Sequence, residues 1–177
     1  MHLQIQKAFP KKFYFSNMKA VTVNQLKKEL VTCTSDELVE LCLRLSKFKK
    51  ENKELLTYLL FESSDETSYI ASVKSQIDEQ FENINTDSFH YIKKSVRKIL
   101  RIIKKFSRYS LKKETEVELL LYFCWKLKNF KPSIQKNTTL LNIYGRQLLY
   151  IKKVVATLHE DLQYDYQLEI DKLKYPF

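Results

Sequence analysis

Glycine occurs once and proline three times in this chain of 177 residues. Strands of a β-sheet are joined by turns, and most tight turns depend on the backbone conformations that glycine and proline favour. A chain with so few of both is therefore predicted to be all-α. Its length suits a single domain with a substantial core, and its hydrophobic content of 44% is typical of a globular protein.

Hydrophobic periodicity predicts about seven or eight helices. The first four have approximate ranges of 23–31, 35–48, 50–62 and 66–84, and a basic fifth helix follows residue 85. The sixth starts near residues 111–115 and ends near 130, the seventh starts at 137–139 and runs to between 158 and 162, and the last spans 164–173. The first, second and sixth begin with the spacing of a capping box, at Thr22, Thr34 and Thr115, and Thr86 is the expected N-cap of the fifth. Short connections favour antiparallel neighbours. The predicted fold is a set of packed αα-hairpins, arranged as a HEAT-like or irregular solenoid or as a helical bundle.

The apolar residues also predict which faces are buried. The sixth helix is apolar nearly all round, so we expect it to be the central helix of the fold. In the second helix the residues expected to be buried are Leu38, Leu41, Cys42 and Leu45. The single glycine, Gly145, falls inside the seventh helix, where it indicates either a close approach of two helices or a tolerated defect.

Residues 88–113 contain ten Lys or Arg and no Asp or Glu. Because the whole chain has a net charge of +10, the remaining residues sum to zero and the basic character is local. One side of the predicted helix carries the apolar residues Phe89, Ile92, Val96, Ile99, Ile103 and Phe106. The opposite side carries Lys94, Lys98, Arg101, Lys105 and Arg108, with Lys93, Arg97 and Lys104 beside them. This pattern predicts an amphipathic helix with a core face and a cationic face.

The cysteines and the chain ends bear on the compartment and the domain boundary. Cys33, Cys42 and Cys124 are widely spaced and none forms a CxxC pair, so we expect free thiols in a reducing, cytoplasmic compartment. The longest apolar run is far shorter than a membrane span, which excludes a transmembrane helix. Residues 1–17 are expected to form a disordered or loosely docked extension, with Met1 or Met18 as the native start, and residues 18–177 to form the helical domain.

The sequence offers no catalytic, cofactor-binding or metal-binding residues. A single glycine excludes a P-loop, a dinucleotide-binding fingerprint and a nucleophile elbow. The three histidines are far apart and none has the spacing of a zinc motif. An enzyme would need a carboxylate pair assembled from distant segments, so we expect a protein without enzymatic activity.

Two stretches resemble a known family. The N-terminal part reads VNQLKKEL, then TSDELVELCLRLSKFKKENKELLTYLL, and the later part contains VRKILRIIKKFS followed by the apolar LLLYF. Across residues 20–165 this order resembles a bacterial family of helical proteins catalogued as a domain of unknown function. The resemblance implies an all-helical fold of paired helices and carries no activity or functional residue.

The cationic face leaves several interpretations open. It could be solvated, or neutralised by the acidic residues of segment 22–87, which carries a net charge of −5. It could also bind an acidic protein surface, a nucleic acid or an anionic membrane surface. We expect a helical scaffold that binds a partner through this face. The alternative is a sequence-tolerant nucleic-acid-binding protein that uses Lys94, Lys98, Arg101, Lys105 and Arg108. The oligomeric state and the partner's identity stay open.

Overall fold

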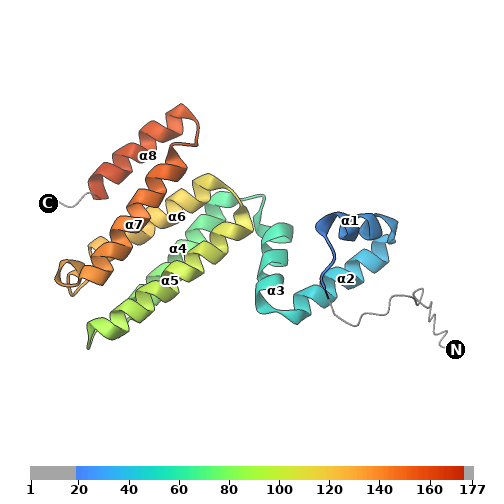
Figure 1. The fold of residues 1–177 in the computed structure, drawn as a ribbon, viewed down its shortest axis with the longest axis horizontal. Helices are drawn as coiled ribbons and strands as arrows, with labels where there is room; N and C mark the ends of the chain where they lie inside the picture. Colours follow the sequence, from blue (N-terminus) through green and yellow to red (C-terminus); the bar gives the residue numbers. More distant parts are fainter. Residues whose placement is uncertain (1–18, 174–177) are drawn as a thin grey trace.

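A computed structural model describes residues 19–173, and within this range the regular secondary structure is helical, with no strand (Figure 1). The α-helices are α1 (Val23–Thr32), α2 (Ser35–Phe48), α3 (Lys50–Thr57), α4 (Glu66–Glu82), α5 (Phe89–Ser110), α6 (Lys113–Lys128), α7 (Thr138–Val155) and α8 (Glu160–Leu173). A π-helical turn, η1 (Tyr58–Glu62), follows α3, and a 3₁₀ turn, η2 (Ile134–Lys136), precedes α7. The prediction of an all-α fold of paired helices is confirmed. The expected extension at residues 1–17 lies outside the described residues.

Helices α4 to α8 form the main body of the molecule (Figure 1). Each packs against the next in sequence, and α6 also contacts α4 and α8. Helix α6 is therefore the central element, as its apolar sequence predicts. Its buried residues are Thr115, Val117, Leu119, Leu120, Leu121, Phe123, Cys124 and Leu127.

Helices α1, α2 and α3 form an arm, residues 23–57, that extends from one end of the body (Figure 1). None of these helices contains a buried residue. The prediction that α2 buries one face is wrong: Leu41 and Leu45 are 39% and 59% exposed, Cys42 is exposed and Leu38 is half-buried. Helical spacing correctly places these residues on one face, but burial needs a second element to cover that face.

The helix ends confirm some capping predictions and correct others. Thr22 pairs with Gln25 and Thr34 with Glu37 in the expected capping boxes. Thr86 and Thr115 are not N-caps, because α5 begins after Ser88 and α6 begins after Lys112. Helix α5 ends where Leu111 adopts a left-handed conformation with φ of 58°, which turns the chain into α6.

The end of α7 also differs from its prediction. The helix stops at Val155 and not between residues 158 and 162. A turn at residues 156–158 follows. In it, the backbone N–H groups of Thr157 and Leu158 donate hydrogen bonds to the carbonyls of Val154 and Val155. This turn lets α8 fold back and pack on both α6 and α7.

Gly145 lies inside α7, and the structure decides between its two interpretations. A Cβ added at Gly145 would meet no heavy atom within 4 Å, and its φ is not positive. No neighbouring helix therefore requires a glycine, which leaves a tolerated defect.

Gly145→Ala should raise the free energy of unfolding by about 0.5–1 kcal/mol. Thermal unfolding should show a midpoint higher by about 1–4 °C, and a lower midpoint would contradict this assignment.

Candidate interaction surface on helix α5

The apolar stripe of α5 is fixed in the core of the body. Ile92, Val96, Ile99 and Ile103 are each at most 1% exposed, and Phe89 and Phe106 are partly buried at the two ends of the stripe. Helix α5 packs with this side against α4 and α6. These side chains are therefore not free to enter a bilayer, which argues against membrane insertion through this helix.

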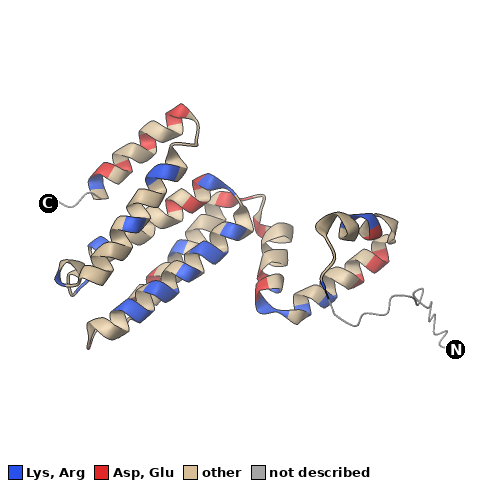
Figure 2. Ribbon diagram, viewed as in Figure 1, with Lys and Arg blue, Asp and Glu red and all other residues tan. Residues whose placement is uncertain are grey.

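The opposite side of α5 presents a row of cations to solvent (Figure 2). Of the five residues predicted to bind a partner, Lys94, Lys98, Arg101 and Arg108 are exposed. Arg97 and Lys104 are exposed beside them, and the Nζ of Lys104 lies 5.9 Å from the ring centroid of Tyr150 on α7. We call the six exposed residues the cationic row: Lys94, Arg97, Lys98, Arg101, Lys104 and Arg108.

Lys105, the fifth predicted residue, is engaged within the chain. Its side chain is only 20% exposed, and its Nζ lies 2.5 Å from Oε2 of Glu54 on α3. The hydroxyl of Tyr109 donates a hydrogen bond of 2.9 Å to the same oxygen. Burial alone would raise the pKa of Glu54, but the bonds from Lys105 and Tyr109 outweigh it and lower the pKa. Lys105 thus joins the arm to the body.

The acidic residues of segment 22–87 do not neutralise the cationic row. Within the part of the chain that the structure describes, the cations of α5 form one ion pair with a carboxylate, between Lys105 and Glu54. Lys105 is not a member of the row. Arg101 instead donates from Nε to the backbone carbonyl of Arg97, at 3.4 Å. The six members of the row therefore share one surface without an acidic partner among residues 19–173. Like charges at this spacing repel one another, so an anionic partner would relieve the repulsion.

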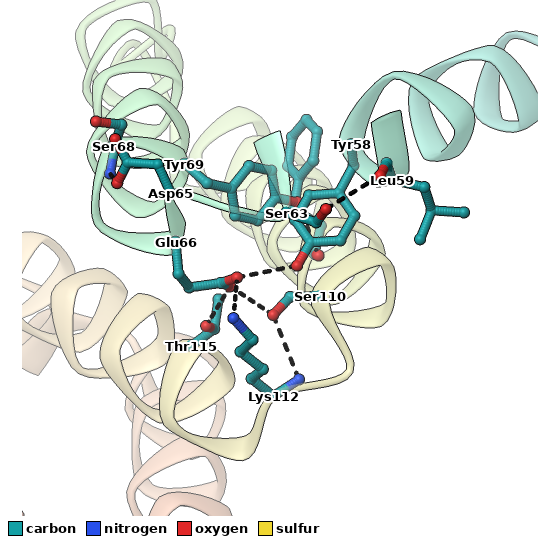
Figure 3. Close-up of polar contacts among 11 residues, drawn as sticks. Tyr58, Leu59, Ser63, Asp65, Glu66, Ser68, Tyr69, Ser110, Lys112 and Thr115 are labelled. Atoms are coloured by element: carbon teal, nitrogen blue, oxygen red, sulfur yellow. Dashed lines mark hydrogen bonds and ion pairs between the residues drawn. The ribbon is translucent and has the colours of Figure 1, made fainter. Parts of the chain in front are cut away.

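A second polar centre lies where the arm meets the body, around Glu66 at the start of α4 (Figure 3). Its Oε1 accepts hydrogen bonds from Ser110, at 2.5 Å, and Thr115, at 2.6 Å. Its Oε2 accepts a bond of 2.9 Å from Tyr58 of η1 and lies 2.9 Å from Nζ of Lys112. One carboxylate thus links η1, α4, the end of α5 and α6.

The environment of Glu66 stabilises its charged form. The side chain is only 17% exposed, and burial by itself would raise the pKa. The bonds from Ser110, Thr115, Lys112 and Tyr58 outweigh burial and lower the pKa of Glu66 to about 2. A carboxylate held in this state is a structural anchor and is not poised to accept a proton near neutral pH. The sequence placed Glu66 only at the start of the fourth predicted helix, and nothing in it pointed to this cluster.

A groove of about 670 Å³ lies between α4, α6 and α8. Its apolar lining includes Tyr122 and Trp125, whose rings stack with centroids 6.0 Å apart. Two carboxylates line it, and each is held by a lysine: Glu118 by Lys74 at 2.6 Å and Glu169 by Lys172 at 2.5 Å. Because both carboxylates are already paired, the groove does not present the converging free acids that an acid–base enzyme needs.

The remaining reactive groups do not form a site among the described residues. Residues 19–173 contain no group of three or more His, Cys, Asp and Glu that could hold a metal ion. Cys124 is fully buried, and burial raises the pKa of its thiol to about 12, so it is an unreactive core residue. In the same range, no helix has the length and apolarity needed to cross a membrane.

No protein-family model, curated protein or solved structure matches this chain. The resemblance to a bacterial family of helical proteins stays a prediction.

Replacing the anchor carboxylate should destabilise the protein in a pH-dependent way. Glu66→Gln keeps the shape but removes the charge that receives four bonds, so the free energy of unfolding at pH 7 should fall by about 1–3 kcal/mol. Because the folded-state pKa lies below the unfolded value of about 4.3, this contribution is complete above that value. It is lost as pH falls from about 4.3 toward 2.

Urea unfolding at pH 7 and pH 2.5 measures the effect, with Glu82→Gln as the control because Glu82 is an exposed residue of the same helix. The difference between wild type and Glu66→Gln should shrink at the lower pH. A Glu66→Gln protein as stable as the control at pH 7 would show that the cluster contributes nothing.

Proposed function

We propose that this protein is a non-enzymatic helical scaffold that binds an acidic partner protein through the cationic row of α5. The observation that carries the proposal is the row itself: six exposed cations on one helix, with no carboxylate partner among the described residues. Exposed charges of a monomeric protein are usually mixed in sign. A continuous positive surface instead attracts anionic partners and raises their association rate.

The geometry of α5 suits recognition of a structured partner. The helix contacts α4 and α6 along its buried side, so its exposed side chains project from a rigid support. From Lys94 to Arg108 the helix rises about 21 Å, at 1.5 Å per residue. Carboxylates spaced every three or four residues along an acidic helix would match this repeat.

The helix arrangement supports a scaffold role. Helix α6 contacts both α4 and α8. Helix α5 packs against α4 and α6, and α7 packs against α6 and α8. Alternate contacts of this kind occur when helix pairs stack in HEAT-like solenoids, so we include a HEAT-like stacking in the proposal. We also place the protein in a reducing, cytoplasmic compartment of a bacterium, consistent with three free cysteines and with the family resemblance.

Nucleic-acid binding is the second candidate, and one observation favours it. The row contains no interleaved acidic residue, as expected for a surface that follows a phosphate backbone. Binders of single strands also use exposed aromatic side chains for base stacking. The exposed rings near this surface are few: His90 and Tyr91 lie in the first turn of α5, away from most of the row, and Tyr150 of α7 lies beside Lys104. An acidic protein is therefore the better match.

Fluorescence anisotropy can separate the two candidates. The probes are fluorescein-labelled polyglutamate and labelled single- and double-stranded DNA, titrated with protein from about 50 to 300 mM salt. The test variant is Lys94→Glu/Lys98→Glu/Arg101→Glu, which leaves Lys105 on Glu54. The control is Lys131→Glu/Lys136→Glu/Lys153→Glu, which also lowers the net charge from +10 to +4 at exposed positions outside α5.

We expect polyglutamate to bind at low salt and the test variant to bind at least about tenfold more weakly. Each reversal removes one attraction and adds one repulsion, of about 0.2–1 kcal/mol each. The control variant should retain most of the binding. Tighter binding of DNA, with a salt slope that falls by about 2–3 in the test variant, would favour the nucleic-acid candidate. Equal losses in both variants, or no binding to any probe at 50 mM salt, would overturn the proposal.

A further inference from the structure

The arm exposes an apolar surface that no other part of the described chain covers. On α2, Leu41, Leu45 and Phe48 follow one another along one face and are 39%, 59% and 77% exposed. On α1, Leu26 and Leu30 are 48% and 43% exposed. We call these five residues the arm surface. Further exposed apolar residues are Val21, just before α1, Val23 and Val31 on α1, and Val39 and Leu43 on the side of α2 opposite Leu41 and Leu45.

This surface is large enough to require a partner. Fully burying one such side chain removes about 60–120 Å² of apolar area from water, so the five side chains of the arm surface, which are on average about half exposed, leave roughly 150–300 Å² uncovered in each chain. Each partner of a stable interface contributes about 800 Å², of which about 60% is apolar. The five residues of the arm surface alone therefore supply a substantial part of the apolar area that a stable dimer needs. Apolar patches of this size on soluble proteins usually mark interaction sites.

The helices of the arm also need a partner for their own stability. Helix α1 has 10 residues and α2 has 14, and isolated helices of this length are marginal in water. Both have complete capping boxes, so their N-terminal ends are well specified, but neither contains a buried residue in the part of the chain that the structure describes. Packing on a second pair of helices would provide the missing burial.

The net charge of the arm indicates which kind of partner would bind the arm surface. Residues 22–48 contain four Lys or Arg and four Asp or Glu, so this segment is neutral in a chain whose net charge is +10. A strongly charged partner would gain little there. A second copy of the chain would be repelled at the cationic row but not at the arm. The arm of another copy is also neutral and apolar, and it is present at the same concentration as the first. We therefore take a second copy of the chain as the occupant of the arm surface.

The contacts between α3, η1 and the body leave α1 and α2 projecting away from the body. Glu54 of α3 is bound by Lys105 and Tyr109 of α5, and Tyr58 of η1 is bound to Glu66. These contacts hold α3 and η1 against the body, while α1 and α2 project beyond it (Figure 1). Two arms can therefore meet while the two bodies lie on opposite sides of the contact.

We infer that this protein forms a twofold-symmetric dimer in which α1 and α2 of two chains pack together as a four-helix bundle. In this dimer the two α2 helices lie antiparallel across the twofold axis, so that Leu41 of one chain meets Leu45 of the other. Cys42, which is exposed between them near the middle of α2, comes close to its symmetry mate. The inference does not depend on what the cationic row binds.

Sedimentation equilibrium of the full chain between about 1 and 100 μM tests the dimer. Wild type should sediment at twice the chain mass of 21.2 kDa. Leu41→Glu/Leu45→Glu places four carboxylates in the dimer core and should weaken association at least 100-fold. The control is Leu149→Glu/Leu168→Glu, at residues that are 61% and 47% exposed on α7 and α8, and it should remain dimeric.

A measurement that leaves Leu41 and Leu45 unchanged avoids any effect of their substitution on folding. A flexible bismaleimide should link two chains of the Cys33→Ser variant through Cys42, and the link should disappear in Cys33→Ser/Cys42→Ser, which keeps only the buried Cys124. A monomer at 100 μM would overturn the inference, and so would a dimer that persists unchanged in Leu41→Glu/Leu45→Glu. A dimer that gives no Cys42 link would also overturn it, because the contact would then lie elsewhere.

Discussion

The buried apolar stripe of α5 determines where the positive charge of this protein lies. Ile92, Val96, Ile99 and Ile103 pack against α4 and α6, so the rotation of α5 about its axis is fixed. A charged side chain cannot be buried without a partner except at a large cost in free energy. The lysines and arginines between the apolar residues are therefore forced to the outer side. Core packing and the presentation of the cationic row are two consequences of one amphipathic sequence.

The sequence predicted most of the helices well, because helix formation obeys local rules. Capping boxes at Thr22 and Thr34 and the period of the stripe on α5 depend on residues within one turn or one helix. The arm shows where such rules end. Leu41 and Leu45 have the spacing of a buried face, yet spacing does not say which element covers it, and among the described residues none does. If two arms pair, the pattern on α2 is explained by a second chain.

The candidate site was only partly predictable for a related reason. The cationic row follows from helical periodicity, and Lys94, Lys98, Arg101 and Arg108 are exposed as expected. The contact of Lys105 with Glu54 joins residues 51 positions apart, and no local pattern records such a pair. The same holds for Glu66 and Thr115, which are 49 positions apart. There, the threonine that looked like a helix cap is a hydrogen-bond donor to the glutamate.

Lysine footprinting would test most directly whether the cationic row is a binding surface. Reductive methylation followed by mass spectrometry reports the reactivity of each lysine, with and without a bound polyglutamate probe. We expect the probe to protect Lys94, Lys98 and Lys104, while the exposed lysines Lys131, Lys136 and Lys153 keep their reactivity. Protection spread evenly over all exposed lysines would contradict it, because binding would then follow net charge and not the surface that α5 presents.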